Sequence, residues 1–214
     1  MEPQQSAIFD RMMMAFKKNR ESFIDIFPFQ QRAETQLQPD QVLIVDVAGG
    51  IGHRVKDFRA KHTNLNGRAI LQDLSYVLPS KESNPEVHAG LMQHDIELME
   101  HDIFKPQTVK NAKYYFFSAI FHGRPDGNCI ELLQNTASAM NEDSRILVND
   151  FVLPDKEALL FHSAFDLWMM ADVAGKERTL SQWEHLADVA GLRLVGVHRL
   201  GTDAVVEFAL KDTA

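Results

Sequence analysis

Three aspartates in this sequence stand where parallel strands would end, and they are the residues best suited to chemistry. Asp46 lies in a β-branched run just before a glycine-rich turn, and Asp73 and Asp102 end the next two strand-like runs. Because ligands of open parallel sheets bind beyond the carboxyl ends of the strands, the three carboxylates are expected to share one site. A carboxylate there can attract an ammonium group or accept hydrogen bonds from ribose hydroxyls. The spacing therefore predicts a cofactor that carries an amino-acid moiety and an adenosine.

The glycine-rich turn after the first apolar run helps to decide which cofactor fits. Gly49, Gly50 and Gly52 let the backbone approach a ligand closely and adopt positive φ. A dinucleotide fingerprint needs a third glycine three residues after Gly52, and that position holds Val55. Asp46 would also repel a pyrophosphate and favour an ammonium group. A nicotinamide oxidoreductase is therefore the least favoured function.

The elements that must position these residues alternate between strands and helices. This alternation predicts an α/β fold with a mostly parallel sheet that is covered on both faces. A short turn at Gly201 joins the last two strands, which are expected to be antiparallel neighbours. The predicted strands are 42–47, 68–72, 96–100, 113–118, 145–150, 192–197 and 204–210, and the predicted helices are 53–61, 127–140, 156–172 and 180–190.

The chain before residue 41 has a different pattern. Residues 6–27 are predicted to form a helix with a broad apolar face, and residues 28–40 are polar and predicted to be a linker. We therefore divide the chain into an N-terminal helical connector or interface segment at 1–40 and one large domain at 41–214. The apolar face of the connector is expected to be partly exposed, as at an interface.

Composition excludes several classes of partner and site. The 214 residues carry a net charge of −8, so no basic surface for nucleic acid is expected. Cys129 is the one cysteine, which rules out an internal disulfide and a cysteine-cluster zinc site and fits a reducing, cytoplasmic location. We expect no membrane partner, because no signal-peptide pattern or membrane-length apolar run is present. No metal site is predicted.

Five ordered segments resemble the motifs of the plant and fungal O-methyltransferases, the caffeate-type enzymes that act on small molecules. The resemblance extends over roughly residues 40–210. It implies a Rossmann-like class I fold that binds S-adenosylmethionine (SAM), with a seven-stranded, mostly parallel sheet, a C-terminal antiparallel hairpin and helices on both faces. The segments are 45–53, 72–74, 101–104, 147–154, and 175–179 together with Trp183.

The same resemblance implies SAM as the cofactor and assigns residues to it. Asp73 would accept hydrogen bonds from the ribose, Asp102 would bind the adenine amino group, and Phe104 would cover the base. Ser118 stands where the family usually has a lysine or arginine near the cofactor carboxylate. The full implied set is Asp46, Gly49, Gly50, Gly52, Asp73, Leu74, Asp102, Ile103, Phe104 and Ser118.

The resemblance also implies a catalytic histidine. His122 matches the family's general base, but Gly123 and Arg124 replace the aspartate and tryptophan that usually follow it. Histidine suits proton removal because its pKa lies near neutrality. Asp150 and Glu177 match the two acidic residues that flank the base, where a carboxylate fixes the imidazole tautomer.

A later helix carries a stripe of large apolar side chains. By pattern alone this stripe belongs to the core, whereas in the family the corresponding helix lines the acceptor site. The implied substrate-binding residues, suited to a flat aromatic acceptor, are His162, Phe165, Trp168 and Met169.

The favoured function is SAM-dependent O-methylation of a phenolic or polyketide-like small molecule in secondary metabolism. The first alternative is a methyltransferase fold that has left methylation and catalyses an isomerisation, dehydration or cyclisation; the changes at Ser118, Gly123 and Arg124 favour it. The second is a non-catalytic subunit. Family members usually carry an N-terminal dimerisation domain, for which residues 1–40 are too short. The partner is therefore expected to be a second copy, as a homodimer, or a subunit that supplies this domain.

Overall fold

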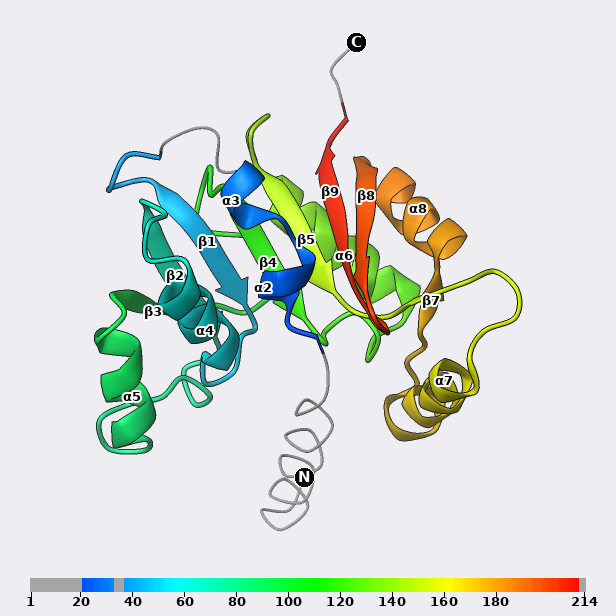
Figure 1. Cartoon of the computed structure of the whole chain (residues 1–214), viewed down its shortest axis with the longest axis horizontal. Helices are drawn as coiled ribbons and strands as arrows, with labels where there is room; N and C mark the ends of the chain where they lie inside the picture. Colours follow the sequence, from blue (N-terminus) through cyan, green and yellow to red (C-terminus); the bar gives the residue numbers. More distant parts are fainter. Residues whose placement is uncertain (1–20, 33–36, 212–214) are drawn as a thin grey trace.

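The computed structural model describes residues 21–32 and 37–211, and a seven-stranded sheet forms its centre. The strand order is β3-β2-β1-β4-β5-β9-β8, so the chain winds outward from β1 in both directions (Figure 1). The strands are β1 (Val42–Val47), β2 (Arg68–Asp73), β3 (Ile96–Glu100), β4 (Tyr114–Ser118), β5 (Arg145–Asn149), β8 (Leu192–Leu200) and β9 (Asp203–Leu210).

The sheet is parallel except at its last two strands. β1 pairs with β2 and β4, β2 pairs with β3, and β4 pairs with β5, all in parallel register. β9 is antiparallel to both β5 and β8, and Gly201 takes a φ of +58° in the turn between β8 and β9. The predicted Rossmann-like sheet with its C-terminal antiparallel hairpin is confirmed.

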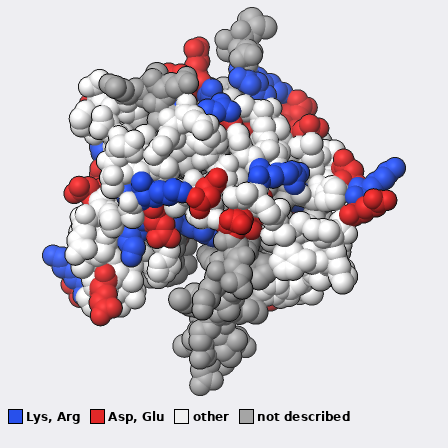
Figure 2. Space-filling model, viewed as in Figure 1, with Lys and Arg blue, Asp and Glu red and all other residues white. Residues whose placement is uncertain are grey.

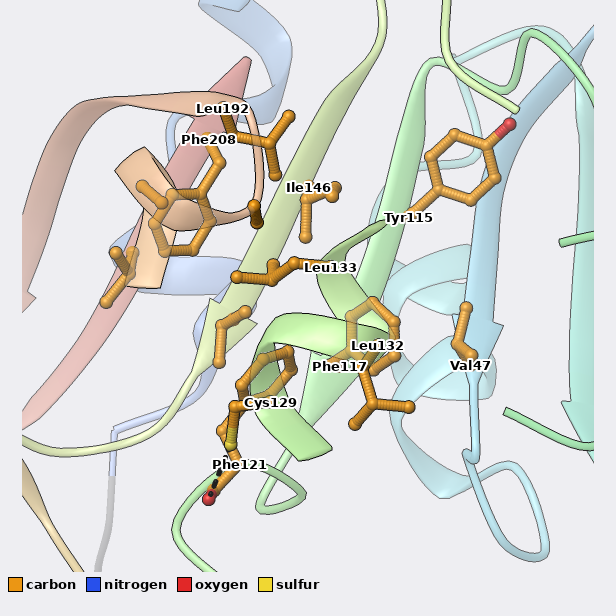
Figure 3. Packing of buried hydrophobic residues seen from close by; sticks show 14 of the residues in the cluster. Val47, Tyr115, Phe117, Phe121, Cys129, Leu132, Leu133, Ile146, Leu192 and Phe208 are labelled. Carbon is orange, nitrogen blue, oxygen red and sulfur yellow. Dashed lines mark hydrogen bonds between the residues drawn. The ribbon is translucent and has the colours of Figure 1, made fainter. Parts of the chain in front are cut away.

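Helices pack on both faces of the sheet because its strands are apolar on both sides. On β4, Tyr114 and Phe116 face one cluster, while Tyr115 and Phe117 face the other. The first cluster lies under α2 (Phe23–Ile26), α3 (Phe29–Arg32), α4 (His53–Lys61) and α5 (Pro85–Met92). The second lies under α6 (Asp126–Ala137) and α8 (Leu180–Val189), where side chains of α6 meet those of β4 and β5 (Figure 3).

A third unit stands beyond the carboxyl ends of the parallel strands. Helix α7 (Leu160–Val173) lies there, next to a two-stranded parallel sheet of β6 (Val152–Leu153) and β7 (Arg178–Thr179) (Figure 1). Because β6 follows β5 directly, this small sheet links the end of the main sheet to the segment that carries Glu177.

The structure corrects the predicted N-terminal segment. Residues 6–20 lie outside the described residues, and between 21 and 27 only Phe23–Ile26 is helical. The expected exposed apolar face is wrong there, because Phe23 is fully buried and stacks on Phe116 with ring centroids 4.0 Å apart. The expected linker at 28–40 is wrong at its start, since α3 buries Phe29 in the same cluster and Arg32 lies 3.3 Å from Glu207 of β9.

The remaining helices follow the predicted ones closely. Helix α4 has the predicted bounds, whereas α6, α7 and α8 start or end a few residues from them. Helix α5 was not predicted, because its sequence Pro-Glu-Val-His-Ala-Gly-Leu-Met buries only Leu91 fully and shows no apolar repeat. The two short strands β6 and β7 were also missed, since two-residue strands leave no alternation to detect.

Charged side chains are dispersed over the molecular face seen in Figure 2. Lysine and arginine side chains there lie scattered among aspartate, glutamate and uncharged residues. In the described part of the chain no helix is long and apolar enough to cross a membrane.

Candidate active site

The glycine turn after β1 is shaped by close contacts that only glycine permits. A Cβ at Gly49 would lie 2.5 Å from Cγ of Asp46 and 2.5 Å from Cδ1 of Leu71. Gly50 has a φ of +63° and Gly52 a φ of +83° at the start of α4. The turn therefore holds its backbone directly against the buried carboxylate of Asp46, which has no exposed surface.

Asp73, at the end of β2, is tied to this turn. Its Oδ2 accepts a hydrogen bond of 2.8 Å from the backbone N–H of Gly50, and its Oδ1 accepts one of 2.7 Å from that of Leu74. Each carboxylate oxygen has a second lone pair, so the group can still accept from a ligand's hydroxyls. The sequence spacing predicted that Asp73 lies near the glycine turn, and the hydrogen bond from Gly50 to Asp73 connects them in the structure.

Asp102 follows β3 on the same edge of the sheet. Its Oδ1 accepts a 2.9 Å hydrogen bond from the backbone N–H of Phe104, which orients the turn that contains Ile103. The guanidinium carbon of Arg124 lies 5.2 Å from the centroid of the Phe104 ring. Arg124, the residue that replaces the family's tryptophan, thus lies over the aromatic ring predicted to cover the adenine.

Ser118 is the last residue of β4, the strand that leads to His122. Its hydroxyl lies 3.4 Å from Oδ1 of Asn149, whose Nδ2 donates to the backbone carbonyl of Ala204 at 2.9 Å. The serine is therefore part of a polar network across β4, β5 and β9. It does not supply the positive charge that the family usually has at this position.

His122 and Glu177 meet beyond the end of β4. Nδ1 of His122 lies 2.9 Å from Oε1 of Glu177, and the two side chains are only 12% and 1% exposed. Burial raises the pKa of Glu177, and the hydrogen bond with His122 opposes that rise. The backbone N–H of Glu177 donates to Oδ1 of Asp166 on α7 at 2.7 Å, which fixes the strand segment that presents the carboxylate.

Asp150 lies beneath the same histidine. Its Oδ2 accepts hydrogen bonds of 3.1 Å from the backbone N–H groups of both Phe121 and His122. A contact to the backbone was not anticipated from the sequence, which suggested a role next to the imidazole. Asp150 also opposes ionisation of Glu177 by raising its pKa, so the two carboxylates lie close together.

Aromatic side chains of α7 gather next to His122. The ring of Phe165 lies 5.8 Å from that of His122, and Phe165 packs edge-on against both Phe151 and Trp168 at 5.2 Å. His162 lies 5.0 Å from Phe151, and Met169 belongs to the same buried cluster. The four predicted acceptor residues therefore lie on the helix that faces the histidine.

Two residues of this region were missed by sequence reasoning. Arg178 is buried and hydrogen bonds to the segment around His122, and Asp126 at the start of α6 pairs with it at 2.8 Å. The sequence showed only adjacent opposite charges at 176–178, which gave no sign of so distant a partner.

Among residues 21–32 and 37–211, no three acidic, histidine or cysteine side chains are gathered as a metal site would require.

Comparison with known proteins agrees with this architecture. Residues 10–193 match a family model described as an O-methyltransferase domain. A demethylsterigmatocystin 6-O-methyltransferase of Aspergillus flavus is 39% identical over 175 residues, which are 81% of this chain and 43% of that protein.

Solved structures show the same likeness in three dimensions. The structure of LepI in complex with SAM superposes with a TM-score of 0.87 at 34% identity over 99% of this chain and 53% of that one. A structure described as a pericyclic reaction enzyme gives 0.79 at 32% identity over 97% and 54%. The chain thus spans about half the length of these relatives. On its matched sequence and its sheet, the chain belongs to the O-methyltransferase domain family.

Proposed function

We propose that this chain is the catalytic domain of a SAM-dependent O-methyltransferase that acts on a phenolic or polyketide-like small molecule of secondary metabolism. The observation that carries the proposal is the 2.9 Å contact between His122 and the buried Glu177. This pair lies beside an aromatic helix and beyond the strand that neighbours the glycine turn. Relatives named as O-methyltransferases support the reaction class.

The residues at the carboxyl edge fit SAM. The buried carboxylate of Asp46 would face the cofactor's ammonium, and the glycine turn would let the ligand approach closely, because no other part of the described chain lies within 4 Å of a Cβ placed at Gly50. Asp73 and Asp102 would take the ribose and adenine, with Leu74, Ile103 and Phe104 as the apolar wall. When bound, SAM supplies an electrophilic methyl group.

The chain's own part in the reaction is to hold the acceptor and remove its proton. Glu177 keeps the proton of the imidazole on Nδ1, so Nε2 of His122 is the nitrogen that accepts the proton of the acceptor hydroxyl. The charge that then develops on the ring is stabilised by the carboxylate. Phe165, Trp168, Met169 and His162 would hold the acceptor's flat ring in line, and such positioning is the larger contribution to the rate.

The proposal includes an N-terminal connector at 1–40, whose helices α2 and α3 pack on a domain at 41–214, and a homodimer or a partner subunit in the cytoplasm. Exposed apolar side chains on α7 support a partner, since Leu160, Leu167 and Met170 are 85%, 61% and 60% exposed. Light scattering tests the homodimer: a particle of twice the chain's mass would support it, and a monodisperse monomer would contradict it.

Calorimetric titration of SAM and of its demethylated product tests the cofactor site. Asp73→Ala is the informative variant, and Asp57→Ala, in α4 outside the proposed site, is the matched control. Micromolar binding that is lost only in Asp73→Ala would support the proposal. Absence of binding to either ligand in the unmodified protein would overturn it.

A second function is favoured by one substitution. Gly123 stands where the family has an aspartate, and a relative of 32% identity is described as a pericyclic reaction enzyme. A rearrangement of a bound substrate would use His122 and Asp150 as acid and base and leave SAM unconsumed. Incubation with acceptors and SAM distinguishes the two, because methyl transfer releases one demethylated cofactor for each product and the rearrangement releases none.

A further inference from the structure

We infer that Arg178, together with Asp126, is a positioning residue that sets the place of His122 against Glu177. The inference rests on the proposed role of His122 and deepens it. It concerns the segment 119–125, which leaves β4, carries His122 and enters α6.

Arg178 binds this segment on both sides of the histidine. Its Nη1 donates to the backbone carbonyl of Phe121 at 2.8 Å, and its Nη2 donates to that of Arg124 at 2.8 Å. Nε and Nη2 also donate to Oδ1 of Asp126 at 3.0 and 2.8 Å. One planar guanidinium therefore spans the residues before and after His122 and the first residue of α6.

The cost of burying this charge indicates that the arrangement is specific. The side chain of Arg178 has no exposed surface, whereas that of Asp126 is 42% exposed. A buried guanidinium is tolerated only when its donors are paired, and here every named contact lies on the His122 segment or at the start of α6. The face of the guanidinium is covered by the ring of Trp183, 5.6 Å from its centre.

Residues 175–178 carry both Arg178, which we call the clamp because it holds the His122 segment, and Glu177, the partner of the base. Glu177 directly precedes Arg178, and the backbone N–H of Lys176 donates to the carbonyl of His122 at 2.9 Å. A Cβ on Gly175 would overlap that carbonyl, so the chain passes as close as glycine allows. Arg178 and this backbone contact thus together set the separation between the segment that holds Glu177 and the segment that holds His122.

Asp150 and Cys129 also contact the segment but do not replace Arg178. Asp150 binds the N–H groups of Phe121 and His122, whereas Arg178 binds carbonyls. The thiol of Cys129 lies 3.5 Å from the carbonyl of Phe121, the contact drawn in Figure 3. A neutral thiol is a weak donor, and the backbone N–H of Arg124, which donates to the same carbonyl at 3.1 Å, belongs to the segment itself. The guanidinium is therefore the charged donor that ties this carbonyl to β7.

The tautomer of His122 provides a readout that needs no substrate. Long-range ¹H–¹⁵N spectra of the imidazole rings report which nitrogen carries the proton, and loss of a signal in His122→Gln assigns the residue. With Glu177 in place, the neutral ring should carry its proton on Nδ1. Arg178→Met and Asp126→Ala should both give a mixture of the two tautomers, and Arg178→Lys should lie between them and the unmodified protein.

The control is Arg68→Met. Arg68 also pairs with a carboxylate through two nitrogens, at 2.6 and 2.5 Å from Glu97, but it lies at the opposite end of β2 from Asp73. This variant should leave the His122 signal unchanged. Cofactor affinity, measured by calorimetry, should change less than about twofold in all variants, because the clamp acts on the base and not on the glycine turn.

The outcomes separate the inference from the proposed function. If Asp126→Ala and Arg178→Met fold and His122 keeps its proton on Nδ1, the clamp is refuted. If Arg178→Met does not fold, Asp126→Ala decides, because its partly exposed side chain can be removed without opening the core. If His122 in the unmodified protein lacks the Nδ1 proton, its pairing with Glu177 is refuted. Both the proposed role of His122 as the base and this inference are then refuted as well.

Discussion

Glu177 Oε1 lies 2.9 Å from Nδ1 of His122 although 55 residues separate them along the chain. The contact joins the residue that precedes β7 to the segment that leaves β4, and it places a buried carboxylate behind the ring. Such a carboxylate fixes the tautomer and stabilises the protonated ring, which are the two requirements for a histidine base.

Glu177→Gln should therefore lower methyl transfer by about 10²-fold, since an amide keeps the shape but loses the charge that stabilises the imidazolium. The rate is measured as release of demethylated cofactor with a panel of phenolic acceptors. Glu184→Gln on the exposed face of α8 is the matched control and should keep the full rate. An unchanged rate in Glu177→Gln would remove Glu177 from the catalytic set.

Gly49→Ala tests the glycine turn. The new Cβ would meet Asp46 and Leu71 at 2.5 Å, so the turn must move. We expect SAM affinity to fall at least about tenfold and the free energy of unfolding to fall by about 1–3 kcal/mol, as for other overpacked sites. Calorimetry and urea denaturation measure the two effects.

Gly127→Ala is the control for that experiment. Nothing lies within 4 Å of a Cβ at Gly127, which is in helix α6. Alanine there should stabilise the protein by about 0.5–1 kcal/mol and leave SAM affinity unchanged. Equal SAM affinity in both variants would show that the turn does not touch the cofactor.

The sheet could be predicted from the sequence because its strands are apolar runs buried on both faces. The strands Val42–Val47 and Tyr114–Ser118 could be predicted without knowing which strands pair with them, because burial on both faces explains their apolar composition. The packing of the N-terminal residues was harder to predict from the sequence. Phe23 looked like part of an exposed interface, because no local pattern tells whether an apolar face packs on its own domain or on another. Phe29 looked like part of a linker, because most of its neighbours in 28–40 are polar.

The candidate site was predictable where the spacing of a local motif determines the geometry. Gly50 and Asp73 were placed together by the rule for strand ends, and they share a 2.8 Å hydrogen bond. Arg178 could not be found in this way, because its partners at 121, 124 and 126 depend on how β7 packs against the start of α6. Contacts between elements far apart in sequence are set by tertiary packing, which no short motif encodes.

The single cysteine offers a test of the core beneath the His122 segment. Burial raises the pKa of Cys129 to about 11, with charges of Arg178 and Asp150 as smaller contributions of opposite sign. At pH 8 a thiol with that pKa is on the order of 0.1% thiolate, which is the reactive form. Iodoacetamide should therefore modify the unfolded chain in urea and spare the native protein. Rapid modification of the native protein would show that the packing of α6 on the segment is loose.

His62 should make the protein less stable in mild acid. Its ring is buried between Phe29 and Phe58, with centroids 5.6 and 5.0 Å away, and neither ring nitrogen has a hydrogen-bond partner within the described structure. Burial, followed by the charge of Lys61, lowers its pKa, and Asp25 opposes the shift.

The sign of the pH effect follows from that lowered pKa. Below about pH 6.5 the unfolded chain binds a proton at His62 that the folded protein binds only at lower pH, so the free energy of unfolding falls as pH falls. His101, whose pKa is also lowered by burial, contributes in the same direction.

His62→Phe should therefore flatten the decline in stability between about pH 7 and pH 5, because phenylalanine fits among the same rings and cannot bind a proton. Urea denaturation at several pH values measures the slope for the variant and the unmodified protein. His185→Phe, on the exposed face of α8, is the matched control and should keep the original slope. An identical slope in His62→Phe would mean that His62 is protonated equally in both states and that α3 packs less tightly on α4 than the ring contacts indicate.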